Sequence, residues 1–215
     1  MKWVDNLKAR IGQQMLAGRT GSADRKITLC TLSEAKSIGI IFDATEYISF
    51  EIVRDLVKQL SNNSISISVL GYVDSKKLID HYLYRKGFDF FCKNDLNWYY
   101  KPVSSQTDQF INEPFDILID LSLDYLFPIH YISSSSKASF KTGRYFLTDT
   151  SLDLMIDIEK EKETLRRLRR DIIRERKSIA ENDEIAPETE KRIEIEFMLK
   201  FLIDQLLHYL PILKK

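Results

Sequence analysis

The chain has 215 residues, of which 44% are hydrophobic and 30% charged, and its formal net charge is zero. A chain of this length buries about 70% of its unfolded surface, so it needs neither disulfides nor a metal to fold. The balanced charge excludes a general attraction of the whole molecule to nucleic acid or membranes. The two cysteines, Cys30 and Cys92, form no C-x-x-C pair, which argues against a zinc or redox site and favours buried thiols in a reducing compartment.

Residues 1–30 are predicted to form a helix and a linker. Trp3, Leu7, Ile11 and Met15 recur at every fourth position, which is typical of one apolar helix face. Residues 18–26 contain two glycines and indicate the linker. Charges interrupt the N-terminal residues, so we expect no signal peptide. Since no apolar stretch is long enough for a membrane span, we expect a cytoplasmic protein without membrane contact.

Residues 31–158 alternate between short apolar runs and helical periodicity, which predicts an α/β core. Helical spacing follows the first strand, through Ile48 to Leu60, and recurs around Leu78 to Leu83, near Phe110 and up to Tyr131. The predicted strands are residues 38–43, 65–73, 88–93, 115–121, 138–144 and 152–158. Strands that alternate with helices indicate a mainly parallel sheet of five to six strands. Right-handed crossovers limit the topology to Rossmann-like or flavodoxin-like strand orders, and we predict a Rossmann-like doubly wound fold.

The strands at 38–43 and 115–121 are the most uniformly apolar, which is typical of strands covered on both faces. In the doubly wound order 3-2-1-4-5-6 these two strands are neighbours, and a ligand crevice opens at their C-terminal ends. The polar residues that follow these strands are therefore the candidates for binding a ligand: Asp43, Thr45, Asp120, Ser122 and Asp124.

Two interpretations of these side chains stay open. Asp43 and Glu46 match a capping box, Asp74 or Ser75 can cap the next helix, and Ser122 or Asp124 can cap the helix after the fourth strand. In the functional interpretation, Asp43 and Asp120 bind a ribose hydroxyl, a sugar or a metal.

Other known sites find little support in the sequence. The turn after the first strand has no glycine and two acids, which excludes a dinucleotide fingerprint. The three histidines have no metal-ligand spacing, so we expect neither a metal nor a cofactor. Lys137, Lys141 and Arg144 are predicted to be solvated surface residues rather than anion ligands.

Residues 159–215 are predicted to form a charged helix and a C-terminal helix that packs on the core. Residues 192–197 alternate as a strand does, but their continuity with the apolar stripe through Leu202 and Leu206 favours helix. Within 164–177, one predicted face carries Arg166, Arg169, Arg170 and Arg174. This face suits RNA or an acidic protein; alternatively it is a solvated surface with pairs such as Glu163 and Arg167. The C-terminal helices are also candidates for a homo-oligomer contact.

Five phrases of the sequence are long enough to be specific: "KSIGIIFDAT", "VLGYVDSKKL", "FDFFCKNDLNWYYKP", "EPFDILIDLSLDYLFPIHYISSSSKASFKTGRY" and "LDLMIDI". Over about residues 25–158 and the final helix, the chain resembles an uncharacterised family of small bacterial cytoplasmic proteins, which implies no reaction. Residues 159–190 look like an insertion relative to that family. "FDILIDL" and "TGR" also resemble the N-terminal half of heptosyltransferases, whose second, nucleotide-binding domain has no room here.

The function that we expect from the sequence is a non-catalytic binding or interaction module, with an acidic partner such as RNA among its candidates. The expectation follows from the lack of a complete nucleophile, metal or phosphate constellation in the sequence. The alternative is a small-molecule enzyme, directed at a sugar or nucleotide, that works at the crevice with Asp43, Asp120 and Asp124.

Overall fold

The computed structural model describes residues 26–61, 65–78, 82, 87–147, 151–178 and 187–213; for 169–178 and 187 it describes the backbone alone. Residues 1–25 of the helix and linker predicted for residues 1–30 lie outside this range, as does most of the helix predicted around Leu78 to Leu83.

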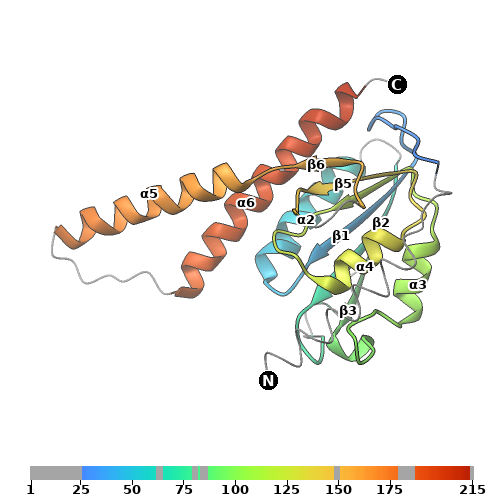
Figure 1. The fold of residues 1–215 in the computed structure, drawn as a ribbon, viewed down its shortest axis with the longest axis horizontal. Helices are drawn as coiled ribbons and strands as arrows, with labels where there is room; N and C mark the ends of the chain where they lie inside the picture. Colours follow the sequence, from blue (N-terminus) through green and yellow to red (C-terminus); the bar gives the residue numbers. More distant parts are fainter. Residues whose placement is uncertain are drawn as a thin grey trace.

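A six-stranded sheet in which every neighbouring pair of strands is parallel forms the centre of the fold (Figure 1). The strands are β1 (Ser37–Asp43), β2 (Ser66–Val73), β3 (Phe88–Cys92), β4 (Ile117–Asp120), β5 (Phe140–Arg144) and β6 (Leu154–Ile156). Their order is β3-β2-β1-β4-β5-β6, so the predicted Rossmann-like doubly wound fold is confirmed. As predicted, the two most apolar strands, β1 and β4, are central neighbours.

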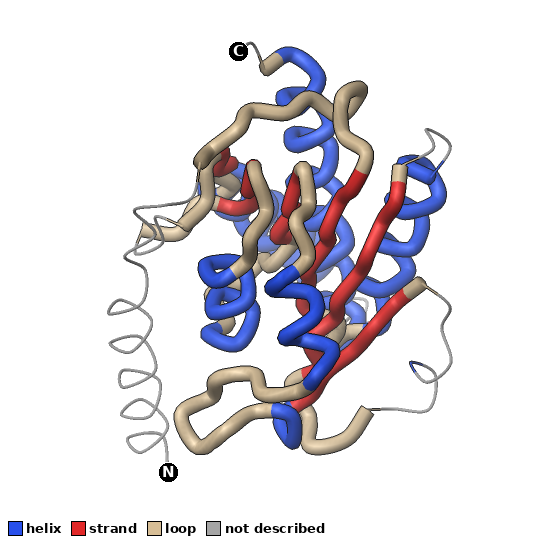
Figure 2. Tube along the Cα trace, turned by 90° about the vertical axis from the view of Figure 1, so that its right-hand side faces the viewer, coloured by secondary structure: helices blue, strands red, loops and turns tan. Residues whose placement is uncertain are grey.

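Helices cover both faces of the sheet (Figure 2). The helices are α2 (Tyr47–Ser61), α3 (Ser105–Asn112), α4 (Phe127–Ser135), α5 (Glu159–Ser178) and α6 (Pro187–Tyr209). Successive side chains of a strand point to opposite faces. In β1, Ile40 and Phe42 therefore join one core cluster with residues of α2 and α6, whereas Ile41 joins another with residues of α3 and α4. This two-sided burial explains why β1 is apolar throughout.

The C-terminal helix α6 belongs to the main core. Leu199, Leu202 and Leu206 are at most 1% exposed and lie in the same cluster as α2 and β1. The residues 192–197 are helical, which confirms the helix predicted there over the alternative strand. The charged helix α5 is also present, and it extends away from the sheet (Figure 1).

Candidate functional site

The segment after β1 differs from the capping box that the sequence predicted. The backbone N–H of Ala44 still donates to the carbonyl oxygen of Tyr72 at 2.7 Å, so the sheet pairing continues past Asp43. Helix α2 therefore begins only at Tyr47, and the Asp43 carboxylate accepts the backbone N–H of Thr45 at 2.9 Å instead. Glu46 pairs with Nζ of Lys191 on α6 at 2.5 Å. The predicted capping box is wrong, and both acids have other partners.

The capping role predicted for Ser122 or Asp124 is also wrong. Helix α4 begins at Phe127 with Leu126 as its N-cap and without a side-chain cap, and a proline occupies its first turn. A proline there has no N–H that needs a partner, and this lowers the demand for a cap. Ser122 instead donates both its backbone N–H and its hydroxyl to Oδ1 of Asp120, at 3.0 and 2.6 Å.

Asp120 is part of a buried polar network that joins the sheet to α4. Its Oδ2 accepts the hydroxyl of Ser133 at 2.6 Å, and Ser133 is completely buried. Lys141 on the neighbouring strand β5 donates from Nζ to the carbonyl oxygens of Ser133 and Ser134, at 2.8 and 3.0 Å. Lys141 is 2% exposed, so the prediction that it is a solvated surface residue is wrong. These contacts give Asp120 and Ser122 a structural role within the core.

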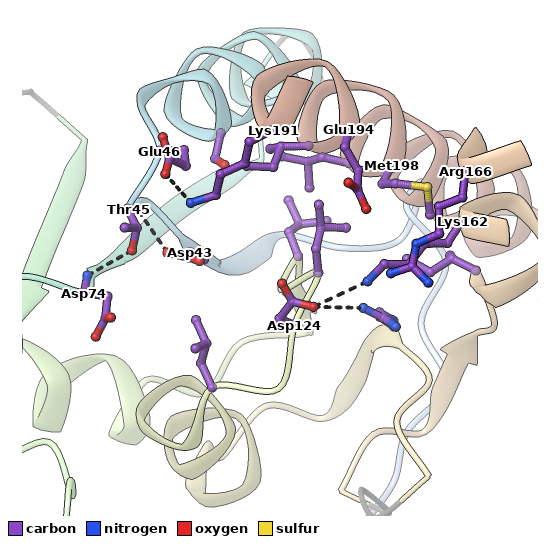
Figure 3. A pocket seen from close by; sticks show the side chains of 18 residues that line it. Asp43, Thr45, Glu46, Asp74, Asp124, Lys162, Arg166, Lys191, Glu194 and Met198 are labelled. Atoms are coloured by element: carbon purple, nitrogen blue, oxygen red, sulfur yellow. Dashed lines mark hydrogen bonds and ion pairs between the residues drawn. The ribbon is translucent and has the colours of Figure 1, made fainter. Parts of the chain in front are cut away.

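A pocket of about 460 Å³ lies where the sheet order changes direction, at the C-terminal ends of β1 and β4. Helices α5 and α6 supply its other wall (Figure 3). Of the five crevice candidates, Asp43, Thr45 and Asp124 line this pocket, whereas Asp120 and Ser122 do not. The charged lining residues are Asp43, Glu46, Asp74, Asp124, Arg144, Lys162, Arg166, Lys191 and Glu194.

One end of the pocket is acidic. Asp43 and Asp74 lie there with Thr45, whose Oγ1 accepts the backbone N–H of Asp74 at 2.9 Å (Figure 3). Burial raises the pKa of the Asp43 carboxyl above its ordinary value; the hydrogen bonds from Thr45 oppose this shift, and the charges of Asp74 and Asp124 add to it. This end offers hydrogen-bond acceptors.

The other end of the pocket is basic, and Arg144 at the end of β5 is its most buried cation. Arg144 is 6% exposed, so the prediction that it is a solvated surface residue is also wrong. Its Nη2 bonds Glu159, and its guanidinium lies over the ring of Phe146, 4.8 Å from the centroid. Its Nε and Nη1 are buried without a hydrogen-bond partner. Buried donors of this kind are rare in folded proteins, and each calls for an explanation, such as a bound group that completes the bonding.

Lys162 and Arg166 on α5 bring two further cations to the basic end (Figure 3). Arg166 is therefore a residue of the predicted basic face that also lines the pocket with three of the five crevice candidates. Arg169, Arg170 and Arg174 also lie on α5, but their side chains are outside the described part of the structure. The predicted pair of Glu163 and Arg167 is present, with 3.3 Å between Oε1 and Nε.

The sequence did not predict that Arg144, Lys162 and Lys191 meet at one pocket. Arg144 could have been predicted as a pocket residue, because it ends a predicted strand next to the switch point, the place between β1 and β4 where the strand order changes direction. No local pattern marked Lys162 and Lys191, since their positions depend on how the first turns of α5 and α6 are placed at the strand ends.

The model of a family of unknown function, DUF6913, matches residues 8–167. The chain belongs to this family. The match begins earlier than the resemblance quoted above and ends within α5, so it does not include the final helix. No curated protein and no solved structure matches the chain. The likeness to heptosyltransferases and a bacterial origin stay predictions from the sequence.

Among the residues that the structure describes, no group of three or more His, Cys, Asp or Glu side chains has the arrangement of a metal site. None of their helices combines the length and the apolar character that a membrane crossing requires.

Proposed function

We propose that the protein is a non-catalytic binding module that holds a small molecule in the switch-point pocket, in the cytoplasm as the sequence predicts. Arg144 is the observation that carries this proposal: it is a buried cation that lines the pocket and has two nitrogen atoms without a hydrogen-bond partner. A buried donor that lacks a partner costs about 1–3 kcal/mol, and a bound ligand that accepts it recovers this energy.

The place and the size of the pocket support the same proposal. In open parallel sheets, ligands bind outside the C-terminal ends of the strands, at the point where the strand order reverses. A volume of about 460 Å³ is within the range of small-molecule sites. The lining combines apolar side chains such as Leu121 and Met198 with charged groups, which is the usual composition of such sites.

The test is equilibrium dialysis of the protein against a cell extract, followed by mass spectrometry of the retained metabolites. The matched control is Glu194→Trp, which adds a large ring on the α6 wall of the pocket and leaves the three cations of the basic end in place. We expect one or a few metabolites to be enriched by the native protein and lost with Glu194→Trp. Equal retention by both proteins, or retention by neither, would contradict the proposal.

An enzyme that works at the same pocket is the alternative function, and the raised pKa of Asp43 favours it. A carboxyl group whose pKa rises toward neutral pH suits a general base or acid. Incubation of the enriched metabolite with native protein and with Asp43→Asn separates the two functions. Turnover that Asp43→Asn abolishes, while binding persists, would establish the enzyme. An unchanged metabolite leaves the binding module as the function.

Helix α5 supports a second interaction, with RNA or an acidic protein. The helix extends away from the sheet (Figure 1), and Arg167 on it is 70% exposed. Changing Arg166, Arg169, Arg170 and Arg174 together to Gln removes the charge and keeps helix propensity high. We expect the native protein to bind generic RNA at about 50 mM salt, with a log–log salt slope of about −0.7 for each phosphate contacted.

Fluorescence anisotropy measures this RNA binding. If the native protein does not bind at low salt, the RNA version of the interaction is wrong, and if the quadruple variant binds equally well, the basic face has no part in it. Light scattering on the same samples tests the homo-oligomer predicted for the C-terminal helices.

A further inference from the structure

The carboxylate of Asp124 is held loosely at the basic end of the pocket. It lies 3.5 Å from Nζ of Lys162 and 4.0 Å from Nη1 of Arg144, and the side chain is 77% exposed. Hydrogen bonds between charged groups are ordinarily about 2.7–2.9 Å long. The carboxylate therefore attracts the two cations without satisfying their donors, and Nη1 of Arg144 has no hydrogen-bond partner.

The cations at this end outnumber the anion between them. Arg144 and Lys162 both lie within 4.0 Å of Oδ1 of Asp124. Arg166 lies next to Lys162 on the same side of the pocket (Figure 3). Glu159 takes one more nitrogen of Arg144 from outside the pocket. Within the described range of the chain, Arg166 has no ion pair, so its charge is available to a ligand.

The geometry points to a phosphate group on the ligand, bound between Arg144, Lys162 and Arg166 in place of the Asp124 carboxylate. This inference rests on the proposed function and adds the chemical class of the ligand. A phosphate group has three outer oxygens, which suits three cations better than one carboxylate does, and arginine is the residue best matched to phosphate oxygens. Asp124 is then a placeholder that offsets part of the positive charge when no ligand is bound.

The acidic end of the pocket defines the rest of the ligand. Asp43 presents acceptors there, and acceptors of this kind bind hydroxyl groups. Oδ1 of the adjacent Asp74 is already taken by the Tyr72 hydroxyl and by Nζ of Lys93, both at 2.9 Å. The Asp43 carboxylate also repels a second phosphate group at that end. The ligand class is therefore a phosphate monoester of a polyol or a sugar, with the phosphate toward α5 and the hydroxyl groups toward the ends of β1 and β2.

Isothermal titration calorimetry with three probe pairs tests this inference. The phosphorylated probes are glycerol phosphate, ribose phosphate and adenosine monophosphate, and each is compared with its dephosphorylated form. We expect at least one phosphorylated probe to bind the native protein more than tenfold tighter than its dephosphorylated form. A charged hydrogen bond contributes enough for a factor of about 10 to 100 in affinity.

Three variants then assign the site. Arg166→Gln is expected to weaken binding of the phosphorylated probe about tenfold, because it removes one phosphate contact. The matched control is Arg167→Gln on the same helix, which does not line the pocket and is expected to leave binding unchanged. Asp124→Asn removes the competing charge and is expected to tighten binding about fivefold, since a unit charge about 4 Å away acts with this strength in water.

Lys162→Gln repeats the test of Arg166→Gln at a second cation, and the thermal midpoint of every variant shows that it is folded. The inference is overturned if no phosphorylated probe binds tighter than its dephosphorylated form, or if Asp124→Asn weakens binding. The proposed function survives that result when the dialysis experiment enriches a neutral or cationic metabolite that Glu194→Trp releases. The proposed function itself fails when the dialysis experiment enriches no metabolite.

Discussion

Removing the hydroxyl group of Ser133 tests the structural role that we assign to Asp120. The hydroxyl donates to Oδ2 of Asp120 at 2.6 Å in a fully buried site. Ser133→Ala keeps the helix and removes this bond alone. A hydrogen bond to a charged group contributes about 1.5–3 kcal/mol, so we expect the free energy of unfolding to fall by that amount. For a chain of this size, the thermal midpoint should fall by about 3–12 °C.

The assay is urea unfolding followed by circular dichroism, with Ser134→Ala as the matched control. Ser134 is the next residue of α4, is half-buried, and its hydroxyl has only a long contact of 3.4 Å with His130. We expect the control to lose less than about 0.5 kcal/mol, as substitutions away from buried networks do. If Ser133→Ala and Ser134→Ala lose the same amount, the buried network does not hold α4 on the sheet, and the assignment of Asp120 is refuted.

Three further predictions concern stability. Burial raises the folded-state pKa of Asp43, so ionisation of this carboxyl opposes folding as the pH rises above the ordinary carboxyl pKa. Asp43→Asn should therefore stabilise the protein more at pH 7 than at about pH 3. An equal effect of the substitution at the two pH values, measured by urea unfolding, would contradict this. An added Cβ at Gly143 would lie 2.5 Å from the backbone oxygen of Asp120. Gly143→Ala should therefore lower the free energy of unfolding by about 1–3 kcal/mol. An unchanged urea midpoint would disprove this close approach. Leu202→Ala should lower the free energy of unfolding by about 2–5 kcal/mol because the side chain is fully buried. Leu207→Ala, at a half-buried position of the same helix, should cost less than half as much. Equal losses would contradict the placement of α6 in the core.

The sequence predicted the sheet well because strand burial leaves a direct trace in composition. Strand β1 is apolar on both faces, and its run of isoleucine and phenylalanine predicts a central strand. Strands β1 and β4 as central neighbours agree with the Rossmann-like order, which the structure has. The apolar stripe of α6 likewise predicted a helix that packs on the core.

The roles of the polar residues were harder to predict because they depend on contacts between distant parts of the chain. Asp120 had the sequence position of a crevice residue, but its partners Ser122 and Ser133 draw it into the core. Arg144 bonds Glu159, which follows β6, and its guanidinium lies over the ring of Phe146. The contacts of Asp120 with Ser133 and of Arg144 with Glu159 have no local signature, so a single sequence does not distinguish a cap, a buried network and a ligand site among such residues.

The orientation of helix α5 could not be predicted from the sequence either. Its spacing predicted a basic helix, which is present as one element from Glu159 to Ser178. That Arg166 lines a pocket while the neighbouring Arg167 is 70% exposed depends on the angle at which α5 leaves the sheet. Helical periodicity gives the faces of a helix but not which face meets the strand ends.

A crystal structure of the protein with the phosphorylated probe that binds best tests the central claim most directly, since it shows the ligand and the pocket together. We expect the phosphate group between Arg144, Lys162 and Arg166, the hydroxyl groups toward Asp43, and the Asp124 carboxylate turned away from both cations. A ligand bound elsewhere on the surface, with Asp124 still between Lys162 and Arg144 and the pocket empty, would contradict the claim.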